Sequence, residues 1–549
     1  MSTAHDGTAG TGKAGIGRRA RAAGRIAAMM ARSGLLRPGP PHRVARQLNA
    51  LRRWGTLLGG TFTSAALRDP GRIAVADDDG ELTYAELDAR TDRLAAALAA
   101  LGEASSRVAV LCRNHRGMLE TLVACSKRGA DLVLLNTGMS TAQLLAVLEE
   151  QQAEVLVADP EFADLLDAVP DRVRVFTAHG PGRGLDELIG AAPAGGIAPP
   201  ARPGRTIMLS SGTTGPPKGA HRHSRPGMTP LASILSRIPY RVHERMLIEA
   251  PLFHTWGYAM LQTAISLRAT VVLRRRFDPE STLRAAAATG ATALVAVPVM
   301  LQRIMELPPE TRAAHDTSAL RITAVSGSAL PGELATAYMD AFGDILYNLY
   351  GSTEASWVTI ATPADLRASP GTAGTPPPGT RVAILDERGE PVPPGGTGRI
   401  FAANELPFAG YTGGGTKETR DGLMSLGDLG TLDEHGRLTV RGRDDDMIVS
   451  GGENVFPSAV EEVLARLPQV REVAVVGAPD EDFGQRLVAY VVPRPGAALD
   501  ADAVREHVRA RLARYAVPRD VHFVRELPRN ATGKVVRGSL APEGQGDPA

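Results

Sequence analysis

Short apolar segments alternate with helical patterns from about residue 80 onward, and this alternation constrains the fold more than any other feature of the chain. The segment 85–101 has the apolar spacing of a helix. The strand candidates around and after it are 107–111, 131–135, 154–158, 172–176, 245–250, 270–274, 292–297, 321–325 and 344–349. Alternation of this kind predicts mainly parallel sheets covered by helices, so we expect an α/β fold.

Two changes in the sequence pattern divide the chain further. Glycine and proline interrupt short β segments from residue 370, which predicts a small β subdomain at about 370–440. After "GRDDDMIVSGG" at 442–452, a compact pattern of strands and helices, the helices at 457–466 and 501–514, predicts a small α+β domain. We therefore expect a large domain at 61–444 and a small C-terminal domain at 445–549.

The first 60 residues have a different character. Residues 1–24 are rich in glycine, alanine and arginine, which predicts partial disorder. Val44, Leu48 and Leu51 recur at helical spacing among arginines, which predicts a basic amphipathic helix. Such a helix either lies on a membrane surface or packs on the protein's own first domain, and we prefer the second interpretation.

Composition excludes several classes of protein. The formal net charge of +1 argues against general nucleic-acid binding. Cys112 and Cys125 are the two cysteines, too few for a disulfide framework and not in a CxxC spacing. No uninterrupted apolar run is long enough to span a bilayer. We expect a cytoplasmic protein, with contact at the inner membrane surface through the N-terminal arm left open.

The stretch "TIMLSSGTTGPPKGAHR" at 206–222 predicts a strand followed by a phosphate-holding loop. It is not a Walker A loop, because Pro217 replaces the second glycine and Gly219 replaces the Ser or Thr after Lys218. Its hydroxyls, backbone amides and lysine can still surround a polyphosphate. The alternative is an ordinary polar turn. Two more polar loops follow strands, at 326–332 and 350–355, where ligands of open α/β sheets bind.

Six motifs in order resemble the superfamily of adenylate-forming, or AMP-binding, enzymes, and the resemblance is closest to fatty-acyl-CoA synthetases (long-chain fatty-acid–CoA ligases). They are "SSGTTGPPKG" at 210–219, "PLFHTWG" at 251–257, "YGSTEA" at 350–355, "LGDLG" at 426–430, "GRDDDMIVSGGENVFPSAVEEVL" at 442–464 and "NATGK" at 530–534. The resemblance implies that ATP and Mg2+ convert a carboxylic acid, expected to be a medium- or long-chain fatty acid, into acyl-AMP. Coenzyme A then takes the acyl group, releasing AMP. The alternatives are an acyl-AMP ligase that loads a separate carrier protein and a catalytically silent nucleotide- or acyl-binding protein.

The resemblance also implies roles for individual residues. Those that bind the ATP phosphates are Ser210, Ser211, Gly212, Thr213, Thr214, Gly215 and Lys218. Those that bind adenine and ribose are Gly327, Ser328, Ala329, Tyr350, Gly351, Asp428 and Arg443. The catalytic group is Lys534, Thr353, Glu354 and His254, with Glu354 as the magnesium ligand.

The remaining roles concern the acid, the thiol and domain motion. Trp256 and Met260 are expected in the acyl pocket, or alternatively as core residues of a helix. Gly451 and Gly452 are expected along the coenzyme A path. Asp445 is expected as a hinge that makes the C-terminal domain mobile. The sequence leaves open whether the protein forms a homodimer. Two positions depart from the family pattern: Leu426 replaces the usual threonine before the Gly-Asp pair, and Leu423 replaces an aromatic residue.

Overall fold

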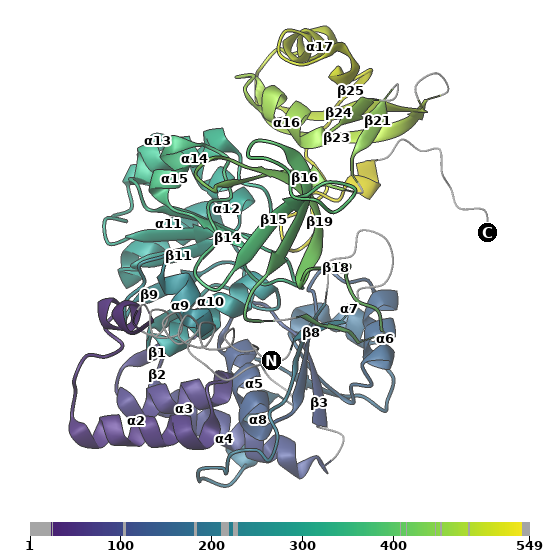
Figure 1. The fold of residues 1–549 in the computed structure, drawn as a ribbon. Coiled ribbons are helices and arrows are strands. Elements are labelled where there is room, and N and C mark those ends of the chain that lie inside the picture. The colour runs from purple at the N-terminus through teal and green to yellow at the C-terminus, as the bar shows by residue number, and fades with distance from the viewer. Residues whose placement is uncertain are drawn as a thin grey trace, which may run out of the picture.

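In the computed structural model, sheets flanked by helices form a large body, and a smaller body made of the C-terminal segment lies at the top of Figure 1. The structure describes residues 24, 26–102, 106–180, 184–209, 219–222, 229–406, 408–412, 414–444, 446–450, 453–480 and 484–540. The α/β class expected from the sequence is confirmed.

An eight-stranded sheet carries several loops with predicted site residues and has the strand order β14-β13-β12-β11-β9-β10-β1-β2. Its strands are β1 (Ile73–Asp77), β2 (Gly80–Thr83), β9 (Arg245–Ile248), β10 (Thr270–Leu273), β11 (Ala293–Ala296), β12 (Ile322–Val325), β13 (Leu346–Tyr350) and β14 (Thr359–Ala361). The inner pairs are parallel, and the edge strands β2 and β14 are antiparallel to their neighbours. Fully buried apolar strands such as β11 are expected where helices cover both faces.

A seven-stranded sheet has the order β17-β8-β7-β4-β3-β5-β6. Its strands are β3 (Arg107–Leu111), β4 (Asp131–Leu134), β5 (Val155–Ala158), β6 (Arg174–Thr177), β7 (Thr206–Leu209), β8 (Gly219–Arg222) and β17 (Phe408–Tyr411). β7 and β8 pair as an antiparallel hairpin, with Leu209 opposite Gly219. This pairing fixes the two ends of the predicted phosphate loop, whose own residues lie outside the described part of the chain.

Helices cover both sheets, and one of them, α10, lies in the core between them. The helices before the C-terminal domain are α2 (Pro41–Trp54), α3 (Leu58–Arg68), α4 (Tyr84–Ala100), α5 (Arg116–Arg128), α6 (Thr141–Glu150), α7 (Ala163–Leu166), α8 (Leu185–Ala191), α9 (Thr229–Leu235), α10 (Thr255–Ser266), α11 (Pro279–Thr289), α12 (Pro298–Glu306), α13 (Pro309–Ala313), α14 (Gly332–Phe342) and α15 (Pro363–Ala368). α10 is apolar nearly all round, as a buried helix must be, and its Met260, Leu261 and Ala264 are fully buried.

The β segments after residue 370 form a separate five-stranded sheet. Its strands are β15 (Arg381–Leu385), β16 (Thr397–Ala403), β18 (Thr419–Arg420), β19 (Leu423–Leu432) and β20 (Leu438–Arg443). Leu426 packs in the core of this sheet with Ile400 and Leu438, and Leu423 packs beside Phe401. Both departures from the family pattern are therefore side chains that fill this apolar core.

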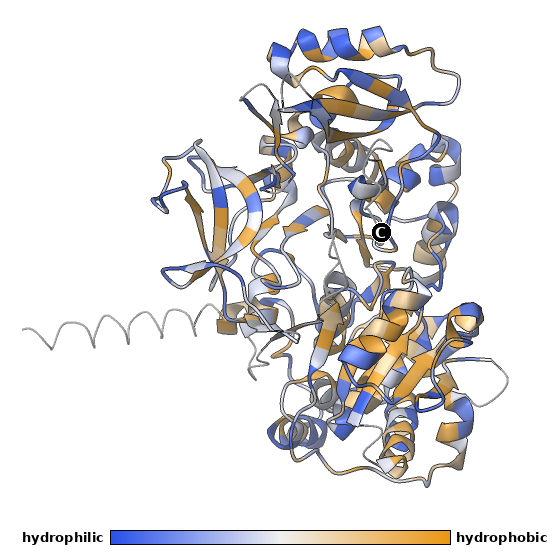
Figure 2. Cartoon of the chain, turned by 90° about the vertical axis from the view of Figure 1, so that its right-hand side faces the viewer, coloured by the Kyte–Doolittle hydropathy of each residue, from blue (hydrophilic) through white to orange (hydrophobic). Residues whose placement is uncertain are grey.

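The C-terminal segment forms another five-stranded sheet with helices. Its elements are β21 (Ile448–Ser450), β22 (Glu453–Val455), α16 (Pro457–Ala465), β23 (Val470–Asp480), β24 (Gly484–Pro493), α17 (Ala501–Arg509) and β25 (Asp520–Phe523). In Figure 2 the sheet is largely orange beneath α17, which shows much blue because most of its residues are polar, and its buried residues are Val504 and Val508. The helical pattern read over 501–514 is wrong beyond Arg509, since the chain there turns into a short 3-10 segment.

The predicted amphipathic helix is α2, and it packs against α3 at the lower left of Figure 1. Arg46, Arg52 and Arg53 lie exposed on it. In the part of the chain that the structure describes, we find no helix with the length and apolarity needed to span a bilayer.

Candidate active site

Loops from several parts of the chain meet at one cavity of about 680 Å³. The loops after β12 and β13 contribute residues at the carboxyl ends of these strands, as expected for an open α/β sheet. The residues that line the cavity near these loops include His254, Ser326, Gly327, Gly351, Ser352, Thr353 and Lys534. The structure therefore brings together motifs that lie up to 280 residues apart in the sequence.

The loop after β13 reverses direction in a tight turn that requires glycine. A Cβ at Gly351 would lie 1.7 Å from the carbonyl oxygen of Ser356, so no larger residue fits. Val358 N–H donates to the Tyr350 carbonyl at 2.8 Å and closes the turn. This geometry directs Thr353 into the cavity. Gly327 after β12 has a φ of +98°, which again favours glycine.

Glu354 accepts a hydrogen bond from the Tyr411 hydroxyl at 2.6 Å. Burial alone would raise the pKa of Glu354, but the hydrogen bond from Tyr411 and the charge of Lys417 hold it below its ordinary value. The carboxylate is therefore charged at neutral pH, and a charged oxygen donor fits Mg2+. Tyr411 ends β17, which pairs with β8 directly after the predicted phosphate loop.

Asp428 of β19 faces Arg443 of β20, with 3.6 Å between Oδ1 and Nη1. The Tyr350 hydroxyl donates to Oδ2 of the same carboxylate. Burial raises the pKa of Asp428, against the hydrogen bond from Tyr350 and the charges of Arg443 and Lys534. A carboxylate with two accepting oxygens beside an arginine suits a pair of ribose hydroxyls.

Lys534 enters the cavity from the C-terminal domain. Its backbone N–H and that of Thr532 both donate to Asn530 Oδ1 at 3.0 Å, which folds "NATGK" into a compact turn. Gly533 has a φ of +83° and touches Val299 of α12, so the turn is pressed against the large domain. Burial lowers the pKa of Lys534, while Asp428 and Glu354 oppose this effect.

His254 caps the N-terminus of α10 by position but makes no side-chain capping bond. Burial, together with the nearby charge of Lys534, lowers its pKa to about 4. It is therefore neutral at physiological pH. Trp256 and Met260 of α10 line the cavity and also pack in the core, so their positions are compatible with both interpretations. The Trp256 indole N–H donates to the Ala296 carbonyl at 2.9 Å.

Several predicted site residues cannot be placed. Residues 210–215 and Lys218, together with Asp445, Gly451 and Gly452, lie outside the described part of the chain. Ser328 and Ala329 follow Gly327 in the loop after β12, and Ala329 is exposed. Neither is among the described residues that line the cavity.

Two residues that shift the pKa values of the site's carboxylates were not predicted from the sequence. Tyr411 binds Glu354 directly, and Lys417 lowers the pKa of both Glu354 and Asp428. Both lie in "YTGGGTK" at 411–417, a glycine-rich stretch that was read only as part of the β subdomain. No spacing signal connects this stretch with residue 354, because β17 reaches the site by joining the edge of a distant sheet.

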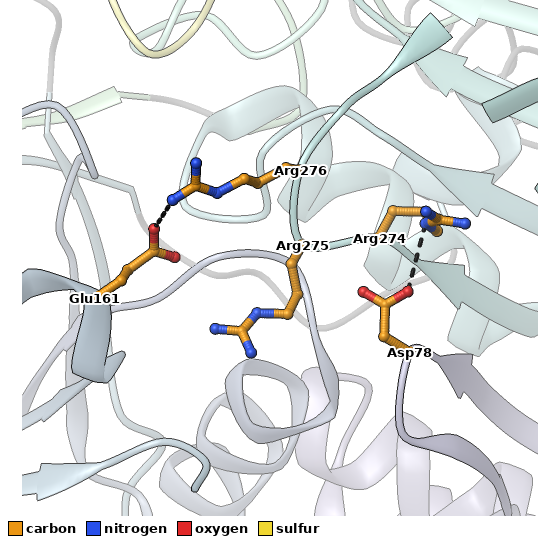
Figure 3. Close-up of a pocket in the computed structure, with 5 residues that line it drawn as sticks. All are labelled: Asp78, Glu161, Arg274, Arg275 and Arg276. Atoms are coloured by element: carbon orange, nitrogen blue, oxygen red, sulfur yellow. Dashed lines mark hydrogen bonds and ion pairs between the residues drawn. The ribbon is translucent and has the colours of Figure 1, made fainter. Parts of the chain in front are cut away.

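A second pocket, of about 370 Å³, is lined by Asp78, Glu161, Arg274, Arg275 and Arg276. Figure 3 shows Arg276 pointing to Glu161 and Arg274 pointing to Asp78. Arg275 contacts the ring of His179, 3.3 Å from Nδ1. Arg275 and Arg276 thus connect the segment after β10 with the segments after β6 and β5, which belong to the other large sheet.

Comparison with known proteins agrees with this geometry. The AMP-binding enzyme family matches residues 62–412, and the AMP-binding enzyme C-terminal domain matches residues 459–534. The chain belongs to the AMP-binding enzyme family. A feruloyl-CoA synthase of Amycolatopsis sp is 36% identical over 494 residues, covering 88% of this chain and 98% of that protein.

Two further similarities bear on substrate and conformation. The fatty acid–[acyl-carrier-protein] ligase ScoC of Streptomyces coeruleorubidus is 31% identical, covering 89% of this chain and 96% of its own. The crystal structure of ATP-bound MatB from Rhodopseudomonas palustris has a TM-score of 0.78 at 29% identity, covering 88% of this chain and 98% of that one.

These similarities establish the class of reaction that the sequence predicts. The chain is an AMP-forming acid–thiol ligase that activates a carboxylic acid with ATP and joins it to coenzyme A. Its substrates include ATP and coenzyme A, and it uses Mg2+. Glu354 is a described residue whose charged carboxylate fits such an ion.

Proposed function

We propose that the acid is a medium- or long-chain fatty acid, converted to acyl-AMP and then to acyl-CoA. The observation that carries this proposal is the shape of the active-site cavity. From Lys534 it continues along α10, lined by Trp256, Ala259 and Met260, and ends among leucines of the N-terminal segment. A long cavity with apolar side chains from α10 and the N-terminal segment along its walls suits an acid with an aliphatic tail.

The reaction begins with the attack of the acid's carboxylate on the α-phosphorus of ATP. Two anions must approach each other, and the buried ammonium of Lys534 offsets their repulsion. Glu354 would hold Mg2+, whose charge stabilises the pyrophosphate leaving group. Asp428 and Arg443 orient the ribose, and neutral His254 stands at the head of the acyl cavity without adding a charge.

An aromatic acid is the second candidate, favoured by the similarity to a feruloyl-CoA synthase. A compact ring would occupy only the part of the cavity near Trp256 and Thr255 and leave the remainder empty. An empty apolar space of that length has no function for a small acid, so we prefer the aliphatic substrate.

A carrier-protein thiol is a second candidate acceptor besides coenzyme A, because ScoC is by its name a ligase for an acyl-carrier protein. In place of coenzyme A, the carrier's pantetheine would then take the acyl group.

One assay tests all of these alternatives. The purified protein is given ATP and Mg2+ with octanoate, dodecanoate, hexadecanoate, ferulate or indoleacetate, and AMP and acyl-CoA are quantified with and without coenzyme A. We expect thioester from the fatty acids, most from the longer ones. Thioester from the aromatic acids alone would refute the proposal, and AMP release without any coenzyme A product would favour a carrier as acceptor.

A further inference from the structure

The apolar stripe of α2 faces the active-site cavity. Val44, Leu48 and Leu51 follow the i, i+4, i+7 spacing of one helix face, and they line the cavity together with the polar Gln47. In α2 itself, the fully buried residue is Ala50. The stripe is therefore not explained by core packing. A helix lying on a membrane would turn this stripe outward.

The cavity reaches α2 by running beside α10. Its lining includes residues of α10 from Thr255 at the first turn to Ser266 at the last. A helix of this many residues is about 18 Å long, since each residue rises about 1.5 Å. With a carbon–carbon bond of about 1.52 Å, an extended alkyl chain rises roughly 1.25 Å per carbon. A carboxylate at Lys534 thus places roughly the fourteenth carbon near the far end of α10.

The wall at that far end is built by residues that precede the matched family region, which begins at residue 62. Leu35, Leu36 and Pro38 lie before α2 and line the cavity with it. In Figure 1 α2 and α3 lie at the bottom, away from the C-terminal domain that supplies Lys534. The two ends of the cavity are thus formed by opposite ends of the chain.

We propose that α2 and residues 35–38 form a distal acyl-binding wall that contacts the end of a saturated chain of about 14 carbons or more. This inference rests on the proposed function. It makes the N-terminal segment a determinant of chain-length specificity rather than a separate arm.

Specific contacts hold the wall in place. Arg68 of α3 is 7% exposed, donates to the Arg37 carbonyl at 3.1 Å, and lies against Gly39. Leu36 and Leu48 line the cavity and are 56% and 61% exposed, so the cavity opens to solvent beside them. A chain longer than the cavity can pass out between these leucines. The wall therefore sets a preferred minimum length and no sharp maximum.

The chain-length profile tests this wall. Leu51→Trp fills the distal cavity, and Asn49→Trp, on an exposed position of the same helix outside the cavity, is the matched control. In the unmodified protein, kcat/KM should rise up to about fourfold per methylene as the tail gains apolar contact. Leu51→Trp should lower the hexadecanoate-to-octanoate ratio of kcat/KM at least tenfold, and Asn49→Trp should leave it within twofold.

The outcomes separate the two proposals. If the unmodified protein uses fatty acids and Leu51→Trp retains its chain-length profile, the distal wall is refuted while the proposed function stands. If the unmodified protein uses none of the fatty acids, both are refuted.

A labelling experiment tests the contact without turnover. Cys112 and Cys125 are buried, so a Leu51→Cys variant carries a single accessible thiol among the described residues. Hexadecanoyl-sulfamoyladenosine, a stable acyl-AMP mimic, should slow maleimide labelling of this thiol at least fivefold, and the octanoyl mimic should not. Equal labelling rates with both mimics would overturn the inference.

Discussion

Lys534 must be charged to act, although its buried position disfavours the charged form. It stands in a cavity whose burial lowers its pKa, and two carboxylates from the large domain act against that effect. The presence of Lys534 in the site could be predicted because "NATGK" resembles a motif of the family. Its lowered pKa could not be predicted from the sequence, since the pKa depends on how the C-terminal domain packs against the large domain.

We expect Lys534→Ala to slow adenylate formation by roughly two to three orders of magnitude. The charged form is the active one, so the rate in the unmodified protein should fall as pH rises through a pKa below 10.5. Lys534→Arg should remove this alkaline fall, because arginine stays protonated. Single-turnover pyrophosphate release measures the first step. Thioester formation from supplied acyl-adenylate is the control, and an equal loss in both steps would contradict the assigned role.

Tyr411 should control the metal affinity of Glu354. Tyr411→Phe removes the hydrogen bond that stabilises the charged carboxylate, so the pKa of Glu354 should rise. Losing a partner of a metal ligand typically weakens metal binding about tenfold or more. We expect a corresponding increase in the Mg2+ concentration that half-saturates adenylation, and a larger one for Glu354→Gln. Tyr515→Phe, at an exposed tyrosine, should change nothing. An unaltered Mg2+ requirement in Tyr411→Phe would show that another group holds the ion.

Glu249 makes stability depend on pH. It is 5% exposed, accepts from the Thr282 hydroxyl at 3.0 Å, and burial raises its pKa from 4.5 to about 7. The folded state thus binds this proton more tightly than the unfolded chain. The stabilisation is complete below pH 4.5 and is lost as pH rises through about 7. One pKa unit corresponds to about 1.4 kcal/mol, so the loss amounts to at most about 3 kcal/mol.

Glu249→Gln isolates this effect, because the amide keeps an acceptor for Thr282 and cannot ionise. We expect the variant to gain thermal stability relative to the unmodified protein when the pH is moved from 5 to 8.5. Melting temperatures by scanning calorimetry measure it. A constant difference between the two proteins across this range would contradict the assignment.

At the scale of helices and strands, elements with a strong local signal could be predicted well. Strand patterns such as 107–111 and 270–274 coincide with β3 and β10, because buried parallel strands are continuous apolar runs. The pattern of α17 was overextended, since a local pattern does not show where the sheet beneath a helix ends. α2 was predicted as a helix, but which surface its apolar stripe meets depends on α3 and α10.

Contact between α12 and β23 holds the C-terminal domain in the observed position. Arg471 of β23 makes two hydrogen bonds to Glu306 of α12, at 2.9 and 2.7 Å, and Gln302 of α12 donates to the Arg471 carbonyl. A partly exposed pair of this kind contributes about 0.2–1 kcal/mol. Arg471→Ala should therefore slow adenylation by no more than about fivefold, with thioester formation from supplied acyl-adenylate unaffected. A slower second step would mean that the pair serves the later conformation. Arg509→Ala, which changes an exposed arginine of α17 that pairs with Glu506 of the same helix, is the control.

At the scale of the whole molecule, the large domain and the C-terminal domain together complete one catalytic geometry. Lys534 occupies the space beside Thr353 and His254 where a thiol must also approach the acyl carbon. We therefore expect adenylation and thioester formation to need different positions of the C-terminal domain, as the sequence predicts. A fixed Lys534 would block the second step, and small rotations about a few residues between elements are the usual solution.

The connection between the domains is short. β20 ends at Arg443 and β21 begins at Ile448. The backbone N–H of Asp444 donates to the Gly427 carbonyl at 3.0 Å, and its carboxylate lies 3.2 Å from Arg399 Nε. Asp444 is thus tied to the large domain, while Asp446 lies 3.9 Å from Arg537 of the C-terminal domain. Asp445, outside the described residues, stands between two residues that are attached to different domains, which supports its predicted hinge role.

Asp445→Pro should therefore separate the two half-reactions. Proline fixes φ near −65° and restricts the preceding residue, so rotation at this position would be hindered. We expect pyrophosphate release in a single turnover to stay within about threefold of normal and thioester formation to fall by about two orders of magnitude. Arg471→Ala should show the opposite pattern, because it weakens the adenylation position and leaves the connection free to rotate. Identical effects of the two variants on both steps would contradict a hinge at Asp445, since a general disturbance of the interface affects the steps alike.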